Sequence, residues 1–248
     1  MAATSKPSPY GTRSPELVAH RGAPRLRTEN TLPAFALAIE QGADAIELDV
    51  HATADGVVVV HHDADVLARP GRGTKRHAIA GMQWSELHDV QLKQGDRIPL
   101  LRDVLALAAG RARVYVEIKG ASIERAVVDA IRDSSADCAV HSFDHAAIAT
   151  VRSLASDVPR GLLLDKKDPL THDIGALVAK YGARDLWPHT SLVDERLVND
   201  VHRAGARIVV WTVNDVSSAR RLASLGVDAL CTDDVPLIGA AVGNEHAG

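Results

Sequence analysis

The chain has 248 residues, of which 46% are hydrophobic and 3% aromatic, and its formal net charge is −4. The length suits one α/β barrel with an aliphatic core, and the mixed charges lack the basic stripe expected of a nucleic-acid-binding protein. No apolar run approaches the roughly 20 residues of a transmembrane helix, and the polar residues 1–15 lack the apolar core of a signal peptide. We therefore expect a cytoplasmic protein that binds no nucleic acid, does not insert stably into a membrane, and has flexible tails at 1–15 and 244–248.

Short apolar runs alternate with helical patterns along the whole chain. Strands are predicted at 17–21, 45–50, 114–118, 138–143, 161–165, 185–188, 208–213 and 228–232, and the helices predicted between them include 31–42, 99–110, 122–134, 194–205 and 216–226. This alternation is typical of a parallel sheet covered by helices, and eight such units predict a TIM (β/α)8 barrel over residues 16–243. A doubly wound open sheet is the alternative, but no Gly-rich dinucleotide turn follows the first strand. Cys138 and Cys231 lie in separate apolar runs, which predicts buried reduced thiols.

One interval, residues 51–98, is too long for an ordinary loop after a barrel strand. It contains the run "VVVVHHD", a Gly/Arg-rich turn with Arg69, Arg72 and Arg76, and a predicted short helix near "WSELHDV". We predict a short insertion after strand 2, at the end of the barrel where active sites form. The arginines could meet an acidic head group, but an exposed and solvated loop is favoured.

Three carboxylates are predicted to point into the barrel. Glu47 and Asp49 stand two residues apart in one strand and therefore share a face, and Glu117 and Lys119 repeat this spacing in the next barrel strand. Carboxylates from neighbouring strands can form an oxygen-only site for Mg²⁺ or Ca²⁺. A buried salt-bridge network is the alternative, but three acids outnumber the one lysine, which favours a divalent cation.

Histidines and cations stand at the ends of the same strands. His20 and Arg21 end the first strand, and His61 and His62 follow the run of valines, where alternation leaves open which ring faces the site. Two imidazoles can act as general base and general acid, arginine and lysine suit a phosphate, and a divalent cation can polarise a phosphoryl oxygen. Because no Gly-x-Ser-x-Gly elbow or Cys–His pair offers another nucleophile, the set predicts metal-assisted cleavage of a phosphate ester.

A series of short motifs runs in order from residue 17 to about 236. They are "AHRG" with "ENT", "GADAIELDV", "VVVVHHD", "RIPLLRDVL", "VYVEIKG", "HSFD", "VVWTVN" and "GVDALCTDDV". In this order and spacing the sequence resembles the glycerophosphodiester phosphodiesterase family. The resemblance implies a TIM barrel with an inserted segment after the second strand, and a metal-dependent hydrolase of glycerophosphodiesters such as glycerophosphocholine and glycerophosphoethanolamine.

The resemblance also implies roles for individual residues. His20 and His62 would be the acid–base pair, Glu47, Asp49 and Glu117 would bind the metal, Arg21 and Lys119 would hold the phosphate, Asn30 would lie near the metal or phosphate, and Trp211 would line the pocket. A glycerol hydroxyl would attack the neighbouring phosphorus to give a cyclic phosphate, which water would open to glycerol 3-phosphate. Glu29 is predicted to be a local structural partner only. The expected partner is a small phosphodiester, and a homodimer is also allowed.

The sequence departs from the family pattern at a few positions. His141 stands where glutamine is usual before "SFD", Leu100 replaces a usual threonine, and Trp187-Pro188-His189 stands where Asn-Pro is common. These departures leave the predicted acid–base and metal residues intact and bear on substrate choice.

Three other functions compete with the leading one. A lysophospholipase D would need an apolar lip, for which "HAIAGMQWSEL" (77–87) offers a modest surface. A barrel aldolase also uses a Glu/Asp pair on its strands, but it would not explain two histidines flanked by phosphate binders. A non-catalytic binding barrel would be expected to lack an acid–base or metal residue, and none is missing.

Overall fold

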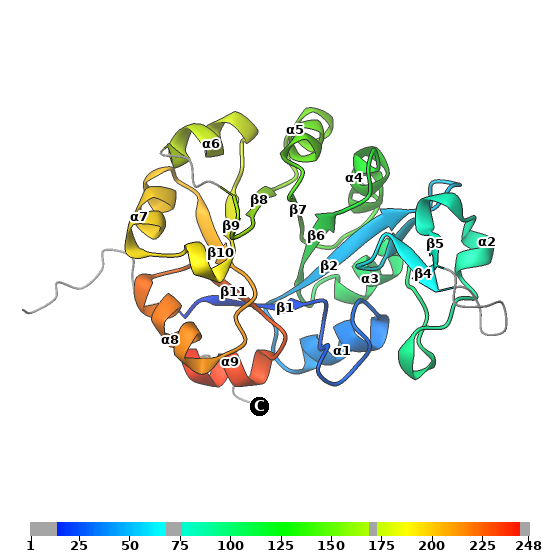
Figure 1. The fold of residues 1–248 in the computed structure, drawn as a ribbon, viewed down its shortest axis with the longest axis horizontal. Coiled ribbons are helices and arrows are strands. Elements are labelled where there is room, and N and C mark those ends of the chain that lie inside the picture. Colours follow the sequence, from blue (N-terminus) through cyan, green and yellow to red (C-terminus); the bar gives the residue numbers. More distant parts are fainter. Residues whose placement is uncertain (1–13, 68–75, 169–172, 244–248) are drawn as a thin grey trace, which may run out of the picture.

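Eight parallel strands pair in sequence and close into a barrel where β1 pairs with β2 (Figure 1). The computed structural model describes residues 14–67, 76–168 and 173–243. The barrel strands are β1 (Glu16–His20), β2 (Ala45–Ala52), β6 (Arg113–Ile118), β7 (Cys138–Ser142), β8 (Arg160–Leu164), β9 (Asp185–Pro188), β10 (Arg207–Val210) and β11 (Ala229–Thr232). This confirms the predicted TIM barrel and every predicted strand. Except for Ser14 and Pro15, the predicted tails lie outside the described residues, as do Arg69 and Arg72.

Helices surround the barrel and start where the sequence supplies capping residues. They are α1 (Leu32–Glu40), α3 (Leu101–Ala108), α4 (Glu124–Arg132), α5 (His145–Leu154), α6 (Ile174–Tyr181), α7 (Glu195–Arg203), α8 (Val216–Leu225) and α9 (Val235–Val242). Each of the last five helices, α5 to α9, has an aspartate directly before its first residue. The side chain of each aspartate accepts a hydrogen bond from a backbone N–H of the first turn, and these residues are Asp144, Asp173, Asp194, Asp215 and Asp234. No helix in the described ranges is long and apolar enough to cross a membrane.

Alternation along the strands divides the core into two layers, as predicted for "AIELDV". Ile46, Leu48 and Val50 pack in the large cluster between the sheet and the helices. Ala45, Tyr115 and Trp187 belong to a smaller cluster inside the barrel. Side chains of Glu47, Asp49 and Glu117 therefore share the interior face. Both cysteines are free and buried, as predicted, Cys138 in the outer layer and Cys231 inside the barrel.

The insertion after β2 is a small structured unit. β3 (Val58–Val60) extends the barrel sheet antiparallel to β2, and β4 (Asp65–Leu67) pairs with β5 (Arg76–Ala78). A 3-10 turn, η1 (Ile79–Gly81), the predicted short helix, here α2 (Trp84–Leu87), and a second 3-10 turn, η2 (Lys93–Gly95), follow. The unit has its own apolar cluster of Val59, Val66, Ile79, Leu87, Val90, Ile98 and Leu100. The leucine at position 100 thus fills a buried apolar position.

Candidate active site

Strand register brings the predicted site residues to the carboxyl end of the barrel. His20 lies opposite Glu47 across β1 and β2, and Asp49 lies opposite Glu117 across β2 and β6. Glu117 in turn lies opposite His141 across β6 and β7. A row of titratable side chains from four adjacent strands therefore faces the barrel interior, at the end where catalytic residues of this fold are found.

Asp49 is the centre of a buried ion-pair network. Its Oδ2 accepts a hydrogen bond from Asn30 Nδ2 at 2.7 Å and lies 3.1 Å from Arg21 Nε, without hydrogen-bond geometry in the second case. Its Oδ1 lies 3.4 Å from Lys119 Nζ. Burial alone would raise the pKa of Asp49, but the charges of Arg21 and Lys119 and the Asn30 hydrogen bond outweigh it and lower the pKa. The network that competed with a metal site in the prediction is thus present around Asp49, and it reaches Glu117, whose Oε1 lies 2.9 Å from Lys119 Nζ.

The loop after β1 is shaped to deliver Arg21 and Asn30 to Asp49. Both residues have left-handed backbone, with φ of 55° and 57°, a conformation that is uncommon outside glycine and often found at functional sites. The Asn30 N–H donates to the Arg21 carbonyl at 3.0 Å, and Arg21 Nη1 donates to Glu29 at 3.1 Å. Gly22 has a φ of 88°, and a Cβ there would lie 2.7 Å from the backbone of Ala34 in α1.

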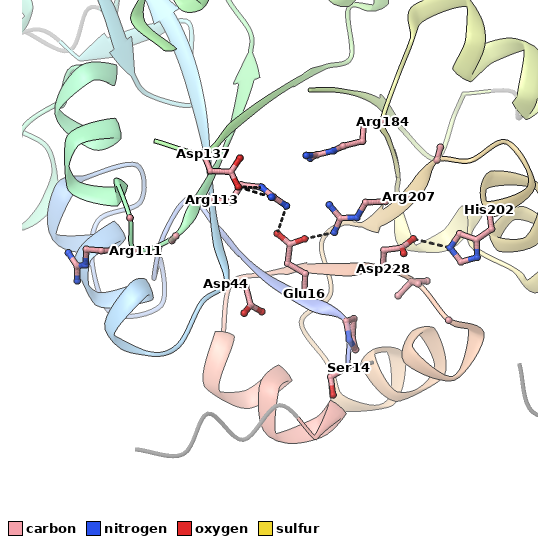
Figure 2. A pocket seen from close by; sticks show the side chains of 16 residues that line it. Ser14, Glu16, Asp44, Arg111, Arg113, Asp137, Arg184, His202, Arg207 and Asp228 are labelled. Carbon is pink, nitrogen blue, oxygen red and sulfur yellow. Dashed lines mark hydrogen bonds and ion pairs between the residues drawn. The ribbon is translucent and has the colours of Figure 1, made fainter. Parts of the chain in front are cut away.

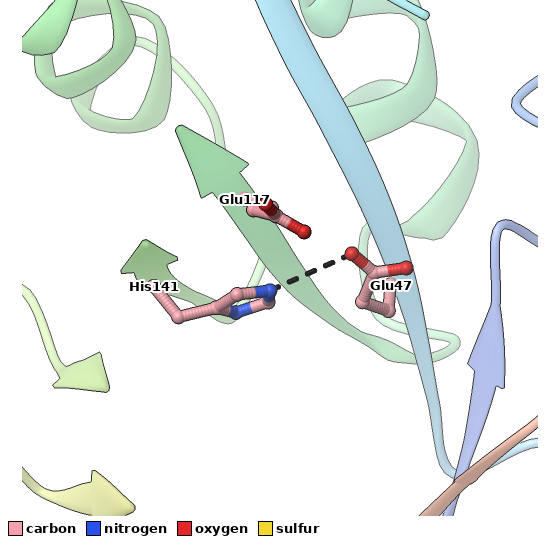
Figure 3. A group of neighbouring side chains, drawn as sticks. All are labelled: Glu47, Glu117 and His141. Atoms are coloured by element: carbon pink, nitrogen blue, oxygen red, sulfur yellow. Dashed lines mark ion pairs between the residues drawn. The ribbon is translucent and has the colours of Figure 1, made fainter. Parts of the chain in front are cut away.

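Glu47, Glu117 and His141 form a second group beside this network (Figure 3). One potential ligand atom from each residue lies within 4.8 Å of the others, and all three residues are buried. His141 Nε2 lies 3.5 Å from Glu47 Oε1. Burial raises the pKa of Glu117 to about 7, with the charges of Asp49 and Glu47 adding to the effect and Lys119 opposing it.

This second group fits a divalent cation. Two carboxylates crowded in a buried site are costly unless a proton or cation neutralises them, and the raised pKa of Glu117 expresses that cost. The described residues contain a metal-ligand group in Glu47, Glu117 and His141, whereas both oxygens of Asp49 face cationic or amide groups. Glu47 and Glu117 thus meet the geometry expected of two predicted ligands, and the ligand role of Asp49 stays a prediction.

His20 is held by an acid that the sequence analysis assigned no role. Its Nδ1 lies 2.7 Å from Asp233 Oδ1, and Asn214 Nδ2 donates to Asp233 Oδ2 at 2.6 Å. Burial would lower the pKa of His20, but the Asp233 hydrogen bond and the charges of Glu47 and Asp233 raise it above its ordinary value. A ring oriented through Nδ1 keeps Nε2 for proton transfer.

His62 has a similar partner in the insertion. Its Nδ1 lies 2.9 Å from Asp63 Oδ1, Arg76 Nη2 donates to Asp63 Oδ2 at 2.6 Å, and His51 Nε2 contacts the His62 carbonyl at 3.2 Å. The N–H of the preceding residue, His61, donates to the Asp49 carbonyl at 2.9 Å, which places this segment beside the carboxyl end of β2. Arg76 is ion-paired with Asp63 and Asp65, so it braces the acid beside His62. Arg76 is exposed, as predicted, although it lies in strand β5 and pairs with two acids of the protein.

Trp211 lies at the mouth of the barrel among other aromatic rings. It meets Phe143 edge-on at 5.4 Å and His189 edge-on at 5.3 Å, and its Nε1 donates to the Trp187 carbonyl at 2.9 Å. The Phe143 side chain is 41% exposed. An aromatic wall at this position agrees with the predicted role of Trp211 in lining the pocket, which stays a prediction.

A further cavity lies at the opposite end of the barrel. It has a volume of about 1260 Å³ and is lined by residues at the amino ends of strands, including Glu16, Arg113 and Arg207 (Figure 2). Glu16 pairs with both arginines, Arg207 Nη1 donates to the Tyr115 hydroxyl at 3.1 Å, and Arg113 also pairs with Asp137. These charges pair with one another, and residues at the amino end of this fold generally contribute to stability. We therefore interpret the charged lining of this cavity as a structural ion-pair network.

The sequence predicts no role in the site for His141, Asp233 or Arg76, although the position of the first two in the chain indicates that they lie near it. His141 stands two residues after Ala139, which lies inside the barrel, so alternation alone places its ring in the interior. Asp233 follows the last strand directly, where barrel residues reach the site, but its partner was not identifiable because the contact spans 213 residues. The Arg76 contact with Asp63 depends on the β4–β5 pairing, which the sequence analysis did not predict.

Comparison with known proteins identifies the family of the chain. The model of the Glycerophosphoryl diester phosphodiesterase family matches residues 20–237. A glycerophosphodiester phosphodiesterase of Caldanaerobacter subterraneus is 30% identical over 237 residues, covering 88% of this chain and 93% of the relative. Glycerophosphodiester phosphodiesterase GDPD4 of Arabidopsis thaliana is 30% identical over 234 residues, covering 89% of this chain and 71% of the relative.

Solved structures show the same fold. The glycerophosphodiester phosphodiesterase of Thermotoga maritima superposes with a TM-score of 0.79 at 27% identity, covering 92% of this chain and 98% of the other. A phosphodiesterase of Oleispira antarctica superposes with a TM-score of 0.83 at 24% identity, covering 93% and 97%. Fold and site together define a barrel hydrolase that cleaves phosphoric diesters. The chain belongs to the glycerophosphoryl diester phosphodiesterase family.

Proposed function

We propose that this protein hydrolyses glycerophosphodiesters, such as glycerophosphocholine or glycerophosphoethanolamine, to glycerol 3-phosphate and an alcohol. The observation that carries the proposal is the pair of Asp-bound histidines beside the buried carboxylates. His20 lies opposite Glu47 across β1 and β2, and His62 directly follows His61, whose N–H donates to the Asp49 carbonyl. The Oleispira antarctica structure holds the product sn-glycerol-3-phosphate, and it supports the same product here.

The two histidines would exchange protons with the substrate. One imidazole accepts the proton of the glycerol hydroxyl as its oxygen bonds to phosphorus, and the other imidazolium protonates the departing alcohol oxygen. Water then opens the cyclic phosphate as the two rings reverse their roles, so the net reaction consumes one water. Because Nδ1 of each ring faces an aspartate, we assign these transfers to Nε2 of His20 and His62.

The other site residues would bind the phosphate and a cation. Arg21 and Lys119, with 18% and 21% of their side chains exposed, reach the pocket surface and would hold the phosphate. Asn30 would orient Asp49, and Trp211 would line the wall. Glu47 and Glu117 would hold a divalent cation, which polarises a phosphoryl oxygen when bound. Mg²⁺ or Ca²⁺, held by three carboxylates with Asp49 included, is the prediction from the sequence.

The packing of the insertion disfavours a lyso-lipid substrate. In the predicted apolar lip of residues 77–87, Ile79 and Leu87 are fully buried in the insertion's own cluster. Leu67 remains as a large exposed apolar side chain of β4. Within the described part of the insertion this leaves little apolar surface for an acyl chain, so we favour water-soluble diesters over the lysophospholipase D alternative.

Release of glycerol 3-phosphate from glycerophosphocholine tests the proposal, with added divalent cation and with EDTA. We expect EDTA to abolish activity and His20→Ala to lower kcat by roughly 100-fold or more, the usual contribution of one acid–base group. His145→Ala, on the outside of the barrel beside Tyr181, is the control. Full activity in EDTA or in His20→Ala would contradict the proposal. The single domain over 16–243, the homodimer and the cytoplasmic location stay predictions from the sequence.

A further inference from the structure

We propose that His141 provides a nitrogen ligand to the cation of this site and makes the site prefer a transition-metal ion, such as Co²⁺, over Mg²⁺ or Ca²⁺. The inference rests on the proposed function in that it concerns the same site. It departs from the all-carboxylate site that the sequence predicts, because one ligand changes from oxygen to nitrogen.

The His141 ring is buried with its hydrogen-bonding capacity unused. The residue is 1% exposed, and its Nδ1 has no hydrogen-bond partner among the described residues. Its Nε2 faces Glu47 Oε1 at 3.5 Å, which is beyond ordinary hydrogen-bond length. Because Nδ1 has no partner among the described residues, Nε2 is the nitrogen through which the ring meets polar groups, and it faces the carboxylates of the site.

The surrounding rings fix the direction of that nitrogen. His141 stacks on Trp187 with ring centres 4.3 Å apart and an interplanar angle of 25°, and it lies against Tyr115 at 6.3 Å. Both aromatic residues are fully buried in the barrel interior. Because the ring is held between a strand and these neighbours, Nε2 is presented to Glu47 and Glu117 as Figure 3 shows.

The spacing and charge of the group suit one divalent ion. Two donors that each lie about 2.1 Å from a tetrahedral ion are about 3.4 Å apart, close to the 3.5 Å between His141 Nε2 and Glu47 Oε1. Two carboxylates and a neutral imidazole around a divalent cation have no net charge, which favours burial. Lys119 contacts both Glu117 at 2.9 Å and Asp49 at 3.4 Å, so its ammonium would have to move aside for an ion at either acid. Asp49 differs in also having Arg21 Nε at 3.1 Å and the Asn30 amide at 2.7 Å as partners.

Ligand chemistry then determines selectivity. Mg²⁺ and Ca²⁺ prefer oxygen ligands, whereas imidazole nitrogen raises the affinity for transition metals. Glutamine, the usual residue of the family at this position, offers an amide oxygen of similar reach. His141→Gln is therefore the matched substitution, because it exchanges a nitrogen donor for an oxygen donor.

Metal binding to the substrate-free protein tests the proposal. Calorimetric titration of chelator-treated protein should show that His141→Gln weakens Co²⁺ binding by at least about tenfold, the lower range for disturbed metal ligation, and changes Mg²⁺ binding far less. Pulsed electron paramagnetic resonance of the Mn²⁺-loaded wild type should show histidine nitrogen coupling that His141→Gln removes and the control His145→Gln retains. Equal losses for Co²⁺ and Mg²⁺, unchanged affinities, or no nitrogen coupling in the wild type would overturn the proposal.

A measurement on the wild type alone covers the case in which His141→Gln does not fold. Anomalous diffraction from crystals grown with Mn²⁺ should place the ion within coordination distance of His141 Nε2, and an ion bound by Asp49, Glu47 and Glu117 without His141 would refute the inference. None of these measurements uses a substrate. An ion on His141 in a protein that cleaves no glycerophosphodiester would therefore contradict the proposed function alone.

Discussion

Replacing Asp233 by asparagine should disable His20 without removing its ring. Asp233 accepts hydrogen bonds through both oxygens, from Asn214 Nδ2 at 2.6 Å and from the His20 ring at 2.7 Å. An asparagine has one acceptor oxygen for these two donors. If that oxygen stays with Asn214, the amide N–H₂ faces His20 Nδ1, which must then accept, and the ring proton moves to Nε2. Nε2 can no longer act as a base in that tautomer.

The expected loss of activity follows from the size of acid–base catalysis. One well-placed acid or base contributes roughly 10²- to 10⁴-fold, so we expect Asp233→Asn to lower kcat/KM by at least roughly 100-fold. The Asp233 hydrogen bond and charge also raise the pKa of His20 against the effect of burial. In the variant, burial and the Arg21 charge act unopposed by Asp233, so the pKa of His20 should fall and its limb of the pH–rate profile should move to lower pH.

The assay combines kinetics with a direct titration of the ring. Profiles of kcat/KM against pH with glycerophosphocholine give the catalytic effect, and imidazole NMR gives the pKa of His20 independently of activity. Asp234→Asn is the matched control, because Asp234 caps α9 and asparagine caps helices equally well. An Asp233→Asn enzyme within threefold of wild type, with an unmoved His20 resonance, would refute the reasoning.

The same pair makes a pH-dependent contribution to stability. A histidine whose pKa is raised on folding stabilises the protein fully below its unfolded pKa, here 6.5, and this contribution disappears as the pH rises through the folded pKa. The difference in melting temperature between wild type and Asp233→Asn should therefore be larger at pH 6 than at pH 8.5. Equal differences at the two pH values would argue against the assigned pKa direction.

Three further predictions concern the cation, the cavity network and the first loop. Burial raises the pKa of Glu117 to about 7, so this carboxyl destabilises the metal-free protein increasingly as the pH rises from 4.5 to about 7. Added cation should therefore raise the melting temperature more at pH 8 than at pH 5 in thermal scans. Arg207→Met leaves Glu16 without one of its cations and should lower the free energy of unfolding by about 2–3 kcal/mol in urea titrations, with kcat unchanged. Gly22→Ala places a Cβ 2.7 Å from the Ala34 backbone at a residue with positive φ. This variant should lower the free energy of unfolding by about 2–4 kcal/mol and reduce activity, whereas a neutral effect would show that the loop can shift.

The fold was predictable because each level of the sequence agrees with the next. Apolar runs, Asp caps and helix-ending glycines all indicate the same βα repeat, and strand alternation places Glu47, Asp49 and Glu117 in the barrel. The internal structure of the insertion was less accessible. Its β4–β5 pairing involves only short segments on either side of a Gly/Arg-rich stretch, and such pairing has little periodicity to indicate it.

The division of the interior acids into two groups could not be predicted from strand spacing. Spacing shows that Glu47, Asp49 and Glu117 share a face, and counting charges against Lys119 alone leaves them short of cations. The structure adds Arg21, whose left-handed backbone turns the side chain inward to Asp49, so that one acid is neutralised by the protein. Lys119 Nζ is shared between Glu117 Oε1 at 2.9 Å and Asp49 Oδ1 at 3.4 Å, whereas the Arg21 side chain serves Asp49. Glu47 and Glu117 also share the His141 ring as a neighbour, so the loop after β1 affects which ligands are left for a metal. Loop conformation at one strand thus bears on metal choice two strands away, and comparing metal selectivity in Arg21→Met with that in His141→Gln would separate the two contributions.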